Sequence, residues 1–206
     1  NHLPAERTRA TVRPGRASAI TNPTDSELAA MRIPNGDVTE DDIEATREHL
    51  ADSLGEANLT EAQLAGEQLS EANFGAADLT DADLGDADLQ DASFVGGTLR
   101  NADLSDADLT GARLSDADLT DARLSGATLA GADLGNATLQ DAVLEGADLT
   151  DTTLIGADLG NADLTGVDLT DAALDRANVA DAIFVDAELP DALTFEDLEA
   201  AGGIVD

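Results

Sequence analysis

Leucine recurs at every fifth position between residues 54 and 189, and no insertion or deletion interrupts the repeat. The 28 central positions hold Leu except at Phe74, Phe94, Val179 and Phe184. Two residues before each centre the chain carries Ala, with departures at Asp52, Glu67, Gly97, Thr152 and Val167. One five-residue unit therefore accounts for about two thirds of the chain.

A period of five fits neither common regular element. An amphipathic helix needs apolar positions about every 3.6 residues, and a flat strand needs them at about every second residue. A chain that bends once in each quintet keeps every Leu and Ala inside, because each corner resets the phase. The pattern therefore predicts a square solenoid.

The unit reads Ala-Asp-Leu-Thr-Asp at residues 77 to 81 and again at 117 to 121. In these residues the chain resembles the pentapeptide-repeat family, and the resemblance covers residues 51 to 190. It implies an all-β solenoid, namely a right-handed quadrilateral β-helix of about seven coils with four quintets in each. Residues 20 apart would then stack, so Phe74 and Phe94 are expected to form an aromatic stack inside one wall.

The segments outside the repeat are expected to flank and cap it. We divide the chain into a basic N-terminal arm with a short helix signal (1–37), a capping helix (38–53), the repeat (54–190) and a C-terminal cap (191–206). Short α-helical caps are expected because the end of a solenoid exposes Leu side chains and strand edges. The C-terminal helix is predicted from Phe195 to Ala201, with Leu193, Phe195, Leu198 and Ile204 facing the last coil. The resemblance adds the alternative that this end forms a dimer.

The composition is strongly acidic, with 44 Asp and Glu against 10 Arg and a net charge of −34. The absence of Cys excludes disulfides and thiolate sites, and no apolar run approaches the ~20 residues of a membrane span. Such a charge opposes direct binding of the rod to nucleic acid or anionic lipid. Abundant Asp with Arg as the only strong base favours a protein from high-salt cytoplasm or brine.

No constellation for catalysis is expected, so we predict that the chain is not an enzyme. The two histidines, His2 and His49, lie outside the repeat, and no glycine-rich phosphate loop or cofactor site is recognisable. With four quintets per coil, carboxylates 20 residues apart form two columns that would attract cations weakly and diffusely. The first holds Asp88, Asp108, Asp148, Asp168 and Glu188, and the second holds Glu61, Asp81, Asp121, Asp141 and Asp181.

The preferred function is a non-catalytic structural or protein-interaction scaffold whose partners include further copies of itself. The outward apolar residues Val95, Ile155 and Val185, which we assign to one column, are the candidate contact stripe. The basic residues Arg7, Arg9, Arg13 and Arg16 are the candidate tether to an acidic wall of the same or a neighbouring molecule.

The alternative function is mimicry of DNA. Residues 51 to 190 hold 30 acids and 4 Arg, a net of −26. Over a rod of about 34 Å this is one negative charge per ~1.3 Å, against one per ~1.7 Å in duplex DNA. The family resemblance implies members that occupy the DNA-binding site of a topoisomerase. Salt adaptation explains the same acidity without such a partner, and molar salt would screen the attraction.

Overall fold

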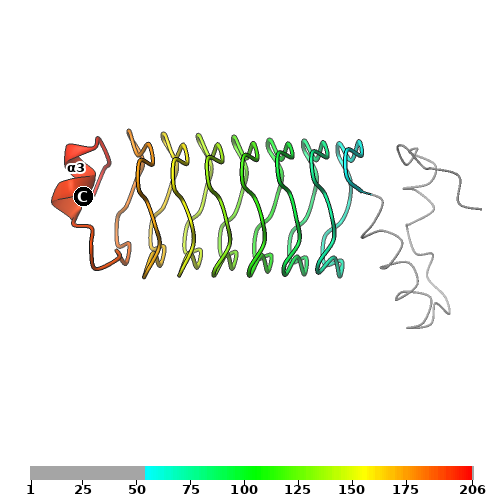
Figure 1. Cartoon of the computed structure of the whole chain (residues 1–206), viewed down its shortest axis with the longest axis horizontal. Coiled ribbons are helices and arrows are strands. Elements are labelled where there is room, and N and C mark those ends of the chain that lie inside the picture. Colours follow the sequence, from blue (N-terminus) through cyan, green and yellow to red (C-terminus); the bar gives the residue numbers. More distant parts are fainter. Residues whose placement is uncertain (1–53, 206) are drawn as a thin grey trace, which may run out of the picture.

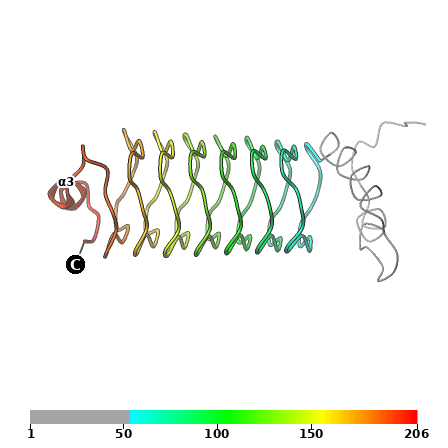
Figure 2. The same cartoon turned by 90° about the horizontal axis from the view of Figure 1, so that it is seen from below.

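The described part of the chain is a straight stack of coils that ends in one short helix (Figure 1). This computed structural model describes residues 54–205. The coils follow one another along the long axis in both views, and α3 (Phe195–Ala200) lies beyond the last coil (Figures 1 and 2). The predicted N-terminal arm and capping helix lie outside the described residues.

Neighbouring coils are joined by single parallel bridges between residues 20 positions apart, such as Asn58 with Asp78 and Asp78 with Thr98. Around each bridge the backbone hydrogen bonds alternate in direction. The Leu59 amide donates to the Asp78 carbonyl at 2.7 Å, and the Asp78 amide donates to the Ala57 carbonyl at 2.9 Å. Each side of a coil is too short for a longer strand, because a corner follows after every five residues.

The core is a column of buried centres with buried Ala between them. Leu104, Leu124 and Leu144 have no exposed surface, and fully burying a Leu side chain is worth about 1.5–3 kcal/mol. The expected aromatic stack is present, since the Phe74 and Phe94 ring centroids are 4.8 Å apart and their planes differ by 4°. The five-residue pattern therefore predicted the core correctly.

Three departures from Ala at the inward position are accommodated in different ways. Thr152 is buried, and its hydroxyl donates to the Leu129 carbonyl at 3.0 Å, which satisfies the polar atom. A side chain at Gly97 would meet the Phe94 carbonyl oxygen at 3.0 Å, so this position beside the Phe stack favours Gly. Glu67, in the first coil, is exposed.

The C-terminal segment caps only part of the last coil. Thr194 and Asp197 form the predicted capping box of α3, and the helix ends one residue before the predicted Ala201. Beyond it Ile204 bridges to Ile183, and the Phe184 amide donates to the Ile204 carbonyl at 2.7 Å. Residues 202 to 205 therefore continue the ladder for one more strand-like segment.

Two of the four residues expected to face the last coil do not do so. Leu198 is buried and Leu193 packs partly against the core, but Phe195 and Ile204 are 42% and 43% exposed. Ile204 occupies the outward position of its segment because it aligns with the outward Ile183. Val205, the next residue, packs against the core in its place.

Candidate interaction surfaces

The coil has four walls, because the bridges repeat every 20 residues and a corner follows each quintet. We name the walls by their central residues. Wall A carries Leu54, Phe74, Phe94, Leu114, Leu134, Leu154 and Leu174. Wall B carries Leu59, Leu79, Leu99, Leu119, Leu139, Leu159 and Val179. Wall C carries Leu64, Leu84, Leu104, Leu124, Leu144, Leu164 and Phe184. Wall D carries Leu69, Leu89, Leu109, Leu129, Leu149, Leu169 and Leu189.

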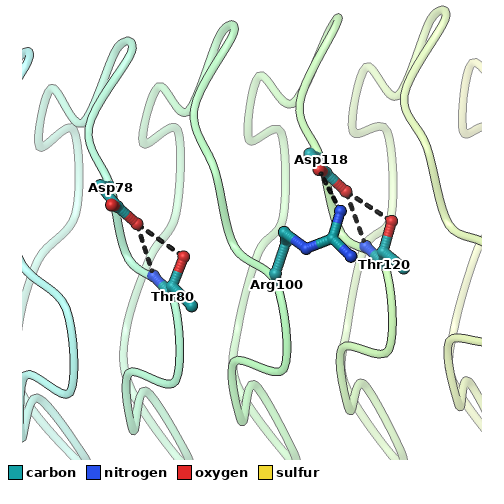
Figure 3. A network of polar contacts seen from close by, with 5 residues as sticks. All are labelled: Asp78, Thr80, Arg100, Asp118 and Thr120. Atoms are coloured by element: carbon teal, nitrogen blue, oxygen red, sulfur yellow. Dashed lines mark hydrogen bonds and ion pairs between the residues drawn. The ribbon is translucent and has the colours of Figure 1, made fainter.

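The residue before each centre points outward and often closes a small turn with the residue after it. The Asp78 carboxylate accepts hydrogen bonds from the Thr80 amide at 3.1 Å and from the Thr80 hydroxyl at 2.6 Å (Figure 3). Asn58 accepts the same two bonds from Thr60, at 3.1 and 2.7 Å. The turn therefore needs a short side chain with an acceptor oxygen, and it does not need a negative charge.

These bonds stabilise the ionised carboxylates. The hydroxyl of Thr80, helped by its amide, holds the pKa of Asp78 below the usual Asp value. Partial burial raises the pKa of Asp118, but hydrogen bonds from Thr120 and the charge of Arg100 outweigh burial, and the pKa is lowered. The carboxylates with a resolved shift therefore remain ionised at neutral pH.

The corners of the coil explain much of the remaining Asp content. Every described residue two positions after a centre has a positive φ between 53° and 71°, a region that favours Gly, Asn and Asp. Eleven of these corners hold Asp, three hold Asn and eight hold Gly. Because neutral residues occupy the same corners, the backbone does not require the charge of Asp.

Two ion pairs involve Arg side chains of the described residues. Arg100 reaches from its coil to the next, and its guanidinium is 3.1 Å from the Asp118 carboxylate (Figure 3). Arg123 lies 3.8 Å from Asp103 in the same way. Both pairs are exposed to solvent, so each contributes little to stability.

The bridges and ladder bonds place the acidic columns where the 20-residue register puts them. Asp88 bridges to Asp108, and Asp168 bridges to both Asp148 and Glu188, so this column runs along wall D. Members of the second column, including Asp81, Asp121 and Asp141, occupy the corners at the edge of wall B. Asn101 interrupts this column and donates a side-chain hydrogen bond to Asp81 at 3.0 Å. A role for either column in binding stays a prediction.

The proposed apolar stripe is wrong in one member. Val95 and Ile155 follow the same outward position of wall A, which recurs every 20 residues. Val185 is 30 residues from Ile155, or one and a half coils, and therefore lies on wall C at the opposite side of the rod. The assignment confused a multiple of ten with a multiple of 20.

Other sequence-based candidates are placed outside the structure or lack supporting geometry. Arg7, Arg9, Arg13, Arg16 and both histidines lie outside residues 54–205. Within that range no three Asp or Glu side chains come together in a way that could hold a metal ion. Of the helices that the structure describes, none is long and apolar enough to cross a membrane.

Comparison with known families finds one match, to the model for pentapeptide repeats. Eight copies of the repeat match, in segments that run from residue 57 to residue 192 with overlaps. These segments cover most of the rod and about two thirds of the chain. No curated protein matches the chain significantly in sequence.

Comparison with solved structures finds the same kind of protein. Two trypsin-treated variants of QnrB1, described as a plasmid-mediated fluoroquinolone resistance protein, align with TM-scores of 0.60 and 0.61 at 20% and 21% identity. They cover 73% of this chain and 81% and 77% of their own. At this identity the likeness shows the fold, which in pentapeptide repeat proteins is a right-handed quadrilateral β-helix.

A further structural match has higher identity but a lower TM-score. HetL from the cyanobacterium Nostoc sp. strain PCC 7120 is a pentapeptide repeat protein described as involved in the regulation of heterocyst differentiation. It is 30% identical over 66% of this chain and 74% of its own, with a TM-score of 0.36.

Proposed function

Because the chain belongs to the pentapeptide-repeat family, we propose that it is a non-catalytic scaffold that binds other proteins. In this proposal it is a rigid acidic rod adapted to high salt, and it contacts partners through its walls, its ends and its N-terminal arm. Its solved relatives are described by a regulatory and a resistance role.

The observation that carries this proposal is that the fold does not need its carboxylates to be charged. Asn58 closes the same turn as Asp78, and Asn101 and Gly111 hold the same kind of corner as Asp81. A rod with Asn and Gly at these positions would keep the same backbone bonds. The excess of Asp therefore acts on the surroundings of the rod, which are salt water and binding partners.

Adaptation to high salt is tested by the salt dependence of unfolding. Self-repulsion of a chain with net charge −34 destabilises the compact state, and the screening length falls from ~10 Å at 0.1 M salt to ~3 Å at 1 M. We expect the midpoint of thermal unfolding, followed by circular dichroism, to rise steeply between 0.1 and ~1 M KCl. Sucrose in place of KCl is the control, because it is excluded from the surface without screening charge. A midpoint that responds equally to both would remove the salt argument.

The proposed role of the N-terminal arm is to tether the rod to an acidic wall. Arg7, Arg9, Arg13 and Arg16 supply four positive charges against one acid, Glu6, in the first 16 residues. We expect replacement of all four by Gln to lower the mass of any assembly that light scattering detects for the full chain. An unchanged mass would exclude the tether and leave the walls as the contact surfaces.

The second candidate function, mimicry of DNA, is favoured by the density of negative charge along the rod. Residues 54 to 190 carry 29 acids and four Arg, a net of −25. The test is a DNA gyrase supercoiling assay over a salt series. Inhibition that fades as salt rises would favour mimicry over the scaffold role, and the absence of inhibition even at low salt would exclude this target.

A further inference from the structure

The four walls differ in the charge of their outward positions, which lie one residue before and one residue after each centre. Wall D carries five carboxylates there and no Arg. Wall C carries four carboxylates with Arg123, and wall B carries three with Arg100. Wall A carries two, Asp133 and Asp175, with Arg113. Wall A is therefore the wall on which another acidic rod could lie with the least repulsion.

Wall A also carries exposed apolar side chains. Three large apolar side chains are exposed among the described residues, and Ile155, at 43%, is the one that lies within the coils. Val95 shares its outward position and is partly exposed. The remaining outward positions of the wall between these two residues hold Ser115, Gly135, Asp133, Arg113 and Thr153. Apart from Arg113, this region has only short side chains, so a flat partner can approach closely.

The order of these residues along the wall has a two-fold symmetry. Successive bridges join Ser93, Arg113, Asp133 and Thr153, so these residues are spaced by one coil each. The midpoint of the series lies between Arg113 and Asp133. Val95 and Ile155 lie at equal distances on either side of the same midpoint, because each is two residues after Ser93 and Thr153 respectively.

We propose that wall A binds wall A of a second copy of this chain, with the two rods side by side and antiparallel. The two-fold axis passes between the coils of Leu114 and Leu134. Arg113 of each rod then faces Asp133 of the other, and Val95 faces Ile155, each contact being made twice. This inference rests on the proposed scaffold function and names one partner for it.

The charge of Arg113 supports this pairing. Arg100 and Arg123 each pair with a carboxylate on a neighbouring coil, whereas Arg113 makes no ion pair within residues 54–205. Its exposed guanidinium is therefore available to a partner. Asp133 is held in place by the Ser115 hydroxyl at 2.7 Å and the Gly135 amide at 3.0 Å, so its carboxylate is oriented before binding.

The size and rim of wall A predict a weak, salt-dependent contact. Seven coils about 4.8 Å apart and five residues of ~3.3 Å give a wall of about 34 by 16 Å, and two apposed walls bury roughly 1,000 Å². That area is at the lower limit for specific interfaces. At one edge the corner Asp91 would approach Asp151 of the partner, a like-charge contact in solvent that salt screens. Association is therefore expected to strengthen as salt rises.

Sedimentation equilibrium of the full chain in 0.1 and ~2 M KCl tests the surface. We expect a concentration-dependent dimer that is more populated at the higher salt, and Ile155→Asp is expected to weaken association at least about tenfold by burying an unpaired charge. The matched control is Val185→Asp, the same kind of change at the equivalent position of the opposite wall, which should leave the dimer intact. A monomer under all conditions, or equal loss in both variants, would overturn the proposal. The gyrase and arm experiments test the wider function separately, because neither involves wall A.

The orientation is tested by cross-linking, which the lack of native Cys makes clean. Val95→Cys with Ile155→Cys in one chain should give a covalent dimer on mild oxidation at high salt. Either single variant should not, because its two thiols would lie three coils or about 14 Å apart, beyond the ~7 Å limit for a disulfide. A mixture of the two single variants should give the covalent dimer again. Cross-linking of a single variant alone would exclude the antiparallel register.

Discussion

Phe74 and Phe94 stack face to face across two neighbouring coils of wall A, with 4.8 Å between ring centroids and 4° between ring planes. Parallel offset stacking of this kind is available because the bridges hold residues 20 apart at the spacing of adjacent strands. Both rings are fully buried, and Gly97 leaves room beside the carbonyl of Phe94. The pair therefore reports on the register of the first coils.

A double-mutant cycle measures the energy of this stack. We expect Phe74→Leu and Phe94→Leu each to destabilise the rod, and the double variant to cost less than the sum by about 0.5–1.5 kcal/mol, the usual coupling of an aromatic pair. Unfolding in guanidinium chloride gives the four free energies. Phe94→Leu with Phe184→Leu is the control cycle, because these residues lie on different walls and should add. Equal coupling in both cycles would mean that the stack contributes nothing specific.

Ala76 occupies a corner that most other coils give to Gly, Asp or Asn. Its φ is 53°, and the left-handed region costs an L-residue with a Cβ about 1–2 kcal/mol. We expect Ala76→Gly to raise the free energy of unfolding by about 0.5–1 kcal/mol, because relief of this strain exceeds the entropy that Gly loses on folding. Chemical denaturation measures the change.

The neighbouring residue Ala77 is the matched control for that substitution. It is buried at an inward position, so Ala77→Gly should destabilise the rod through lost packing and greater chain entropy. Destabilisation by both substitutions would mean that the corner at Ala76 is not strained.

The sequence predicted the core because one physical constraint acts on every quintet. A buried Leu and a small Ala must recur wherever the chain turns a corner, and Leu104, Leu124 and Leu144 are fully buried as expected. The stacking of Asp88 with Asp108 followed from the same 20-residue register. Both depend on spacing alone, which the sequence contains in full.

The surface was predicted less well because outward positions obey several rules at once. Asp78 serves a turn and Asp81 serves a corner, yet both were interpreted only as surface charge. Val185 was assigned to the wrong wall, although counting in units of 20 would have separated it from Ile155. Phe195 and Ile204 were expected to cover the last coil, and the register of the final segment, which hydrophobicity does not determine, exposes both.

Asp168 and Asp78 allow the repulsion within a column to be measured. Both accept a hydrogen bond from the amide two residues later, at 2.9 and 3.1 Å, but Asp168 lies between Asp148 and Glu188, whereas Asp78 lies between Asn58 and Thr98. We expect Asp168→Asn to raise the free energy of unfolding in low salt by about 1 kcal/mol relative to Asp78→Asn, since charges ~4.8 Å apart in water interact by about 1 kcal/mol. The difference should vanish near 1 M salt, where the screening length is ~3 Å.

Urea unfolding of both variants at several KCl concentrations gives this difference directly. A gap that persists in high salt would mean that the two Asn side chains close their turns unequally. A gap that is absent even in low salt would show that the carboxylates of wall D lie too far apart to repel one another.

The hydroxyl of Thr80 should make part of the stability of the rod depend on pH. Its hydrogen bond is the largest cause of the lowered pKa of Asp78, and both neighbours of Asp78 in its column are uncharged. Because the folded pKa lies below the unfolded value of about 3.9, the bond stabilises the rod above that pH and is lost as pH falls through the folded pKa. We expect Thr80→Val to cost no more than about 0.5 kcal/mol at neutral pH, since Asp78 is largely exposed, and nothing once Asp78 is protonated. The pKa of Asp78, read from the NMR shift of its carboxyl carbon, should rise in the variant while that of Asp168, which has its own Thr170, stays unchanged. An Asp78 titration that Thr80→Val leaves where it was would show that the hydroxyl does not stabilise the carboxylate.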